Sequence, residues 1–212
     1  MVTARQHNKQ TMKMTYIIIG SILALGLIIY LTSCGNKSTS SDNQNTSAQD
    51  TSKQKVIHPK ENTYEGLRNM AFTVSPDTLG LNLSKDKTEV YGVIMDWEMG
   101  GAVATTIAYM TGDASMYTST GGGVIGGGQH QNVNSAAKQL IKVAQIYLDK
   151  AVKTETTPLP QTDNVKFYIL TNKGIYVGQE VMSNFENNSS KWLGLFEQSN
   201  IVLTELRKSV GE

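Results

Sequence analysis

Residues 89–119 read EVYGVIMDWEMGGAVATTIAYMTGDASMYTS and decide the fold. Three runs in this stretch alternate or favour β-branched and aromatic side chains, as half-buried strands do. The runs are 89–97, 102–110 and 114–119. Gly100-Gly101 and Thr111-Gly112-Asp113 supply the tight turns between them. Strands joined by such short turns must be antiparallel, so the stretch predicts a three-stranded meander.

Helices and a second hairpin surround this meander. Apolar residues recur at helical spacing from Val133 to Ala151 and again from Trp192 to Val210. Between those helices, 165–171 and 175–181 are predicted strands around Asn172-Lys173-Gly174, a loop with glycine in its left-handed position. A short helix is also expected ahead of the meander, after a sequence resembling a capping box at 62–65.

The element order is therefore helix, three strands, helix, two strands, helix. A mostly antiparallel five-stranded sheet packed with helices is the economical way to bury the apolar stripes of these elements. We expect an α+β fold. About 150 residues, 57–212, are enough to form this single domain around one core.

The first 33 residues have the three parts of an export signal. Basic residues without any acid precede an apolar run over 16–32, and Leu31-Thr32-Ser33-Cys34 ends it. Residues 12–34 resemble the lipobox-type signal of bacterial lipoproteins. The resemblance implies that the Cys34 thiol receives a diacylglycerol, that 1–33 is removed as a signal peptide, and that palmitate-type acyl chains hold the protein on a membrane.

An uncleaved transmembrane anchor is the alternative, because about seventeen apolar residues reach the lower limit for a spanning helix. Positive charge ahead of the run orients either version with the C-terminal part outside the cytoplasm. Residues 34–56 are Ser, Thr, Asn and Gln with hardly an apolar side chain, which predicts a flexible tether. We expect a membrane-anchored protein of the cell envelope.

Charge and cysteine content exclude some classes of function. Loss of residues 1–33 removes three cations and no acid, which leaves 16 Lys and Arg against 18 Asp and Glu. A nucleic-acid partner is not expected, because no clustered basic excess is present. Cys34 is the only cysteine, so the domain has no disulfide.

A glycine-rich stretch between the third strand and the main helix is the most unusual feature of the chain. Its six glycines are Gly121, Gly122, Gly123, Gly126, Gly127 and Gly128. The spacing formally matches GxGxxG, but the parallel βαβ context of a dinucleotide site is missing, and no Gly-Lys-Ser/Thr follows. Two readings remain: backbone N–H groups that bind a polar ligand, or a close-packed crossover that needs glycine.

Catalytic and metal chemistry have few candidates. Ser119, His130 and Asp113 are the residue types of a nucleophile, a base and an orienting acid, but nothing in their spacing favours a triad. No cofactor is expected. With only His58 and His130 in the folded part, no histidine metal site is expected either.

Two acids near the end of the first strand allow a further reading. Asp96 and Glu98 flank Trp97 and form, with Asp113, a possible acidic cluster for acid–base work or a hard cation. The simpler expectation is that Asp96 lies at an exposed strand end and that Glu98 is solvated beside the glycine turn.

Together these patterns predict a non-catalytic, lipid-anchored domain that binds an envelope protein or a small polar ligand. One alternative is a hydrolase or transferase that uses Ser119, His130 and Asp113 beside the glycine-rich stretch. Another is an immunity-type lipoprotein that neutralises a toxin.

Overall fold

The predicted meander forms one half of the sheet in the computed structural model, which describes residues 63–211. Its strands are β1 (Val90–Glu98), β2 (Val103–Tyr109) and β3 (Ala114–Thr118), paired antiparallel in that order. Every residue of β1 and β2 is buried. The centre of the sheet is therefore covered on both faces.

The second hairpin, β6 (Asn164–Thr171) and β7 (Gly174–Val181), joins the meander through β1. Two short strands, β4 (Gly123–Val124) and β5 (Val152–Thr154), pair at the outer edges. The order across the sheet is β4-β3-β2-β1-β6-β7-β5. All pairings given for it are antiparallel.

The α+β class and the antiparallel sheet are thus confirmed, but the predicted number of five strands was wrong. The described chain forms a seven-stranded sheet. The two strands that were missed contain two and three residues. Such short segments cannot display a period of two, and glycine in β4 weakens its strand propensity further.

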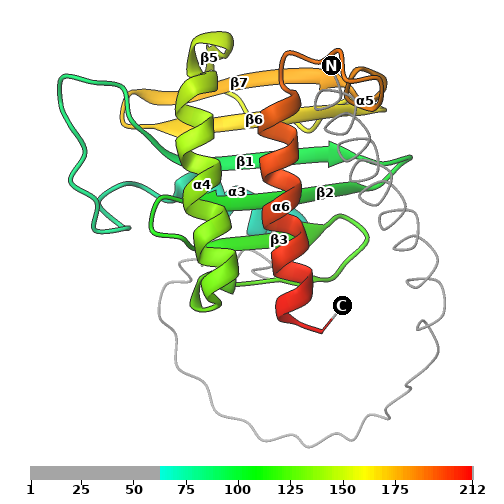
Figure 1. Cartoon of the computed structure of the whole chain (residues 1–212), viewed down its shortest axis with the longest axis horizontal. Coiled ribbons are helices and arrows are strands. Elements are labelled where there is room, and N and C mark those ends of the chain that lie inside the picture. The colour runs from blue at the N-terminus through cyan, green and yellow to red at the C-terminus, as the bar shows by residue number, and fades with distance from the viewer. Residues whose placement is uncertain (1–62, 212) are drawn as a thin grey trace, which may run out of the picture. The chain divides into compact units, whose positions relative to one another are not determined.

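Helices cover both faces of the sheet. Figure 1 shows α4 (Gln131–Tyr147) and α6 (Leu193–Ser209) side by side on one face, with α3 (Tyr64–Thr73) behind the sheet. Single turns, η2 (Gly127–Gln129), η3 (Leu148–Lys150) and α5 (Met182–Glu186), connect the longer elements. None of the helices in the described part is both long and apolar enough to cross a bilayer.

Alternate residues of β1 supply the two cores. Ile94 belongs to the cluster that packs against Leu67 and Phe72 of α3. Trp97, on the other face, meets Phe196 of α6 edge to face with ring centroids 5.3 Å apart. This alternation is the period-two pattern predicted from the sequence, and apolar residues of the helices pack against both faces of β1.

Candidate functional site

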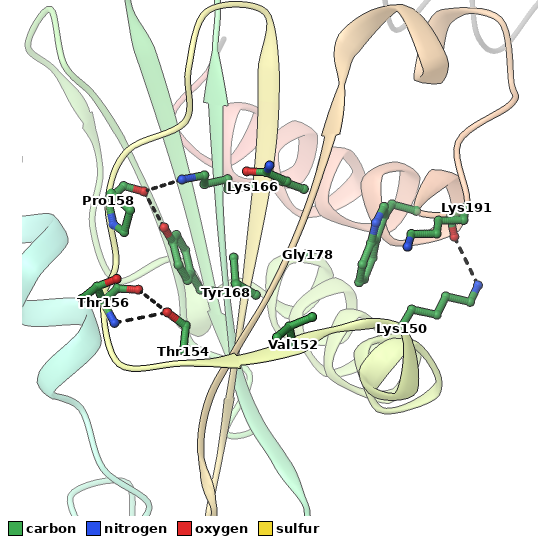
Figure 2. Close-up of a pocket in the computed structure, with 12 residues that line it drawn as sticks. Lys150, Val152, Thr154, Thr156, Pro158, Lys166, Tyr168, Gly178 and Lys191 are labelled. Atoms are coloured by element: carbon green, nitrogen blue, oxygen red, sulfur yellow. Dashed lines mark hydrogen bonds between the residues drawn. The ribbon is translucent and has the colours of Figure 1, made fainter.

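A pocket of about 400 Å³ lies at the β5–β7 edge of the sheet, and we call it the edge pocket (Figure 2). Its size lies within the range of small-molecule and peptide-residue sites. The pocket is lined by residues from η3, β5, the segment after β5, β6, β7 and the two positions before α6: Lys150, Val152, Thr154, Thr156, Pro158, Lys166, Tyr168, Val177, Gly178, Gln179, Lys191 and Trp192.

The pocket exists because β5 is shorter than its neighbour. β5 pairs only with Ile175, Tyr176 and Val177 of β7. The chain reaches β5 from η3, which bends away before the pairing can extend further. Gly178–Val181 consequently has no strand on its outer side in the described chain, and Gly178 and Gln179 lie in the pocket lining.

Trp192 forms an aromatic wall of the pocket. Its ring stacks on Phe167 and on Tyr147, with centroids 5.8 and 5.9 Å apart. A Cβ atom at Gly178 would lie 2.2 Å from Cζ2 of the indole, so only glycine fits beneath this ring. Trp192 is 1 % exposed, and its Nε1 has no hydrogen-bond partner among the described residues.

Three lysines line the pocket, and none of the lining residues is an acid. Lys150 Nζ donates to the Lys191 carbonyl at 3.2 Å and lies 4.2 Å from the centroid of the Tyr147 ring. Lys191 Nζ lies 5.7 Å from that of Trp192. No ion pair joins these lysines to a carboxylate within the part of the chain described here.

Lys166 approaches the pocket from its other side. Its Nζ donates to the carbonyls of Pro158 and Leu159, each at 3.2 Å. Burial lowers the pKa of Lys166, and the positive charge of Arg68 acts in the same direction while Asp96 opposes it. An anion in the pocket would favour the charged form of this lysine and offset part of that cost.

The segment after β5 is held in place as a wall of the pocket. Arg68 Nη2 donates to the Thr157 carbonyl at 2.9 Å, and the Tyr168 hydroxyl donates to the Pro158 carbonyl. Burial, followed by the negative charge of Asp96, raises the pKa of Tyr168 to about 12. Because that hydroxyl remains protonated near neutral pH, the wall stays bonded to β6.

Behind this wall lies a buried polar network that the sequence did not indicate. Asp96 is 0 % exposed, which corrects the expectation of an exposed strand end. Its carboxylate accepts hydrogen bonds from Arg68 and, at 2.6 Å, from Thr105 Oγ1. The Tyr64 hydroxyl bonds the same Thr105 hydroxyl at 2.8 Å. The network joins α3 to β1 and β2.

Glu98 is also buried rather than solvated, with 7 % of its surface exposed. Its carboxylate accepts the backbone N–H of Gly101 at 2.5 Å and that of Asp163 at 2.7 Å. These hydrogen bonds lower the pKa of Glu98. The residue ties the β1–β2 turn to the segment before β6, which is a structural role.

The three catalytic candidates are not brought together. Asp113 precedes β3 and Ser119 follows it, so the strand separates them. Asp113 Oδ2 accepts a hydrogen bond from Thr111 at 2.9 Å, and Ser119 Oγ accepts the Val103 N–H at 2.8 Å. His130 occupies the N-cap position of α4 and makes no side-chain capping bond. Asp113 does not join Asp96 in an acidic cluster either. Asp96 is the Cα partner of Thr105 near the start of β2, whereas Asp113 lies after the end of β2.

Packing accounts for three of the six glycines in the glycine-rich stretch. A Cβ atom would lie 2.2 Å from the Met116 carbonyl at Gly123, 2.4 Å from Leu206 at Gly127, and 2.3 Å from the Asp113 carboxylate at Gly128. Gly121, Gly122 and Gly126 are exposed with positive φ and have open space around the missing side chain. Close packing therefore explains Gly123, Gly127 and Gly128, and the positive φ of the backbone explains the other three.

No group of three or more metal-ligating side chains occurs among residues 63–211. Cys34, the expected lipidation site, lies outside the described residues, as do the signal peptide and the whole of the tether. Sequence reasoning missed the edge pocket because its lysines come from η3, from β6 and from the segment that precedes α6. No local motif connects them.

Comparisons of this chain with protein-family models, with curated proteins and with solved structures find no match.

Proposed function

We propose that this chain is a lipid-anchored protein of the cell envelope whose α+β domain binds an anionic group in the edge pocket. The observation that carries the proposal is the charge of the lining, which has three lysines and no Asp or Glu. In such a site the ammonium groups attract an anion more strongly than a solvated surface does, because the walls exclude part of the water.

The state of these lysines supports binding over a purely structural role. Their hydrogen bonds go to carbonyl groups, which leaves their charges without a paired carboxylate in the described region. A binding role is also favoured over the hydrolase or transferase alternative, because Asp113 and Ser119 lie at opposite ends of β3. The domain is expected to work by presenting a site rather than by catalysis.

Trp192 adds an apolar surface to the same site. Its indole lies against Gly178, and its Nε1–H has no partner within the described chain. A ligand that combines carboxylate oxygens with a short apolar part therefore fits best.

Binding is tested by calorimetric titration of the full-length protein in detergent micelles with citrate, a small polyanion. The double variant Lys150→Gln/Lys191→Gln is compared with Lys138→Gln/Lys142→Gln, which removes two exposed lysines of α4. We expect the first pair to weaken citrate binding about tenfold, since two solvent-accessible charge contacts contribute up to about 1 kcal/mol each. Equal affinities for the two double variants would overturn the proposal.

The lipid anchor has a separate test. Cys34 with its preceding Leu31-Thr32-Ser33 predicts thioether-linked diacylglycerol. Radiolabelled palmitate is expected to enter the wild-type protein and not the Cys34→Ala variant. Equal labelling of both proteins, or of neither, would remove the lipoprotein part of the proposal and leave the pocket unaffected.

A further inference from the structure

We infer that the occupant of the edge pocket is an extended peptide segment with two successive acidic side chains, which adds to the outer edge of β7 as a strand. The inference rests on the proposed function, because it names the chemistry of the ligand for the same site. It uses two features that a free anion does not need: an open strand edge and lysines on both sides of it.

The strand edge is open where the pocket lies. Pairing with β5 ends at Val177, and Gly178–Val181 continues β7 without an outer neighbour in the described chain. In an edge strand, alternate residues direct N–H and C=O groups outward, where an added strand can pair with them. The four residues span about 13 Å. Within them the Val181 N–H already donates to Glu180 Oε1 at 3.1 Å, and the other outward groups are left for an added strand.

Residues of the open edge are directed to both faces of the sheet. A Cβ atom at Gly178 would meet Trp192, so residue 178 is directed toward the α6 face. Gln179 is the Cα partner of Lys166 and is directed to the opposite face. Figure 2 shows Lys166 and Pro158 on one side of Gly178, and Lys150 with Lys191 on the other. The lysines therefore flank the edge.

Side chains of an added strand alternate between these faces. One acidic residue would direct its carboxylate toward Lys150 and Lys191, and the next residue would direct its own toward Lys166. Glu180, the acid nearest to this edge on β7, accepts with Oε1 from Asn184 Nδ2 at 2.8 Å and from the Val181 backbone N–H at 3.1 Å. Two successive acids thus match the charge on both sides of the edge.

A free dianion satisfies only part of this arrangement. It neutralises lysines but leaves the backbone of Gly178–Val181 without a strand partner. Lysines at a strand edge also have a purely protective role in many sheets, where they prevent edge-to-edge association. These two alternatives predict different responses to a peptide, so a set of matched peptides separates them.

The test is calorimetric titration of the full-length protein in detergent micelles with Ac-Thr-Glu-Glu-Thr-NH2. Controls are Ac-Thr-Gln-Gln-Thr-NH2, the Glu peptide with both Glu amides N-methylated, and citrate. We expect the Glu peptide to bind about tenfold more tightly than each of the three. Amide hydrogen exchange is measured in parallel, and added protection is expected within Gly178–Val181.

The outcomes distinguish the inference from the proposed function. If citrate or the N-methylated peptide binds as tightly as the Glu peptide, the site takes anions without strand addition, and the inference fails alone. If the Gln peptide binds equally well, the acidic requirement is wrong. If neither citrate nor any peptide binds, both the inference and the proposed function fail, and edge protection explains the lysines.

Discussion

Arg68 of α3 donates from Nε to both carboxylate oxygens of Asp96 on β1, at 3.0 and 3.2 Å, and from Nη2 to Oδ2. The two side chains are 7 % and 0 % exposed. Burial opposes the charge of the guanidinium, yet the hydrogen bonds and charge of Asp96 outweigh it and raise the pKa of Arg68. The same guanidinium holds the Thr157 carbonyl, so this ion pair connects the core with the wall of the edge pocket.

Removal of one partner of this pair is expected to destabilise the domain strongly. Arg68→Met leaves the Asp96 carboxylate buried without its counter-charge, at a cost of about 3 to 5 kcal/mol in the free energy of unfolding. Arg68→Met/Asp96→Asn should recover a large part of that loss, because no uncompensated charge remains. Urea unfolding of the four proteins measures the coupling, and additive effects of the two substitutions would contradict the ion-pair account.

Gly178→Ala is expected to displace Trp192 and to lower stability by about 1 to 3 kcal/mol, the usual cost of overpacking. The added methyl group would overlap the indole at 2.2 Å. A smaller ring should relieve the overlap, so Gly178→Ala/Trp192→Phe is the matched control. Thermal unfolding followed by circular dichroism tests this. If the double variant is no more stable than Gly178→Ala alone, the contact with Trp192 is not the cause.

Substitution of alanine for glycine in the glycine-rich stretch is expected to lower stability by different amounts at different positions. Gly127→Ala places a methyl group 2.4 Å from Leu206 and should cost about 1 to 3 kcal/mol. Gly121→Ala meets no atom, so only the strain of a φ of 100° remains, which costs about 1 kcal/mol. Neither substitution should change citrate affinity. A loss of affinity without a loss of stability would instead place the ligand at the glycine-rich stretch.

Glu98 makes stability depend on pH. Its pKa is lower in the folded chain than in the unfolded chain, so its contribution is present above the ordinary pKa of 4.5 and is lost as pH falls through the folded value. Glu98→Gln should therefore lower the free energy of unfolding by about 1 kcal/mol at pH 7 and by less at pH 3. Denaturant titrations at several pH values test this, and parallel profiles of the two proteins would contradict it.

Strong periodicity explains which parts of the fold the sequence predicts. Strands β1 to β3 and helix α4 show their apolar pattern over many residues, and their observed bounds lie close to the expected ones. β4 and β5 are edge strands too short for such a pattern. The pairing of β1 with β6 depends on which strands pack side by side in the sheet, and no local signal encodes it.

The candidate site depends even more on tertiary structure. Asp96 resembles a strand-end acid in the sequence, and its burial follows from Arg68, 28 residues earlier on α3, the helix that covers the same face of the sheet. Likewise, Lys150, Lys166 and Lys191 line one pocket only because β5 ends early beside β7.

The most direct test of anion binding in the edge pocket is the NMR resonance of the Trp192 indole N–H during titration with citrate. The chain has two tryptophans, and the signal that disappears in the Trp97→Phe variant is assigned to Trp97. In the wild-type protein the Trp97 signal then serves as an internal control. If citrate binds in the edge pocket, the Trp192 resonance shifts and the shift saturates, while the Trp97 resonance does not move. In the Lys150→Gln/Lys191→Gln variant a higher citrate concentration is needed for the same shift. An unmoved Trp192 resonance, or equal shifts of both tryptophans, would contradict it.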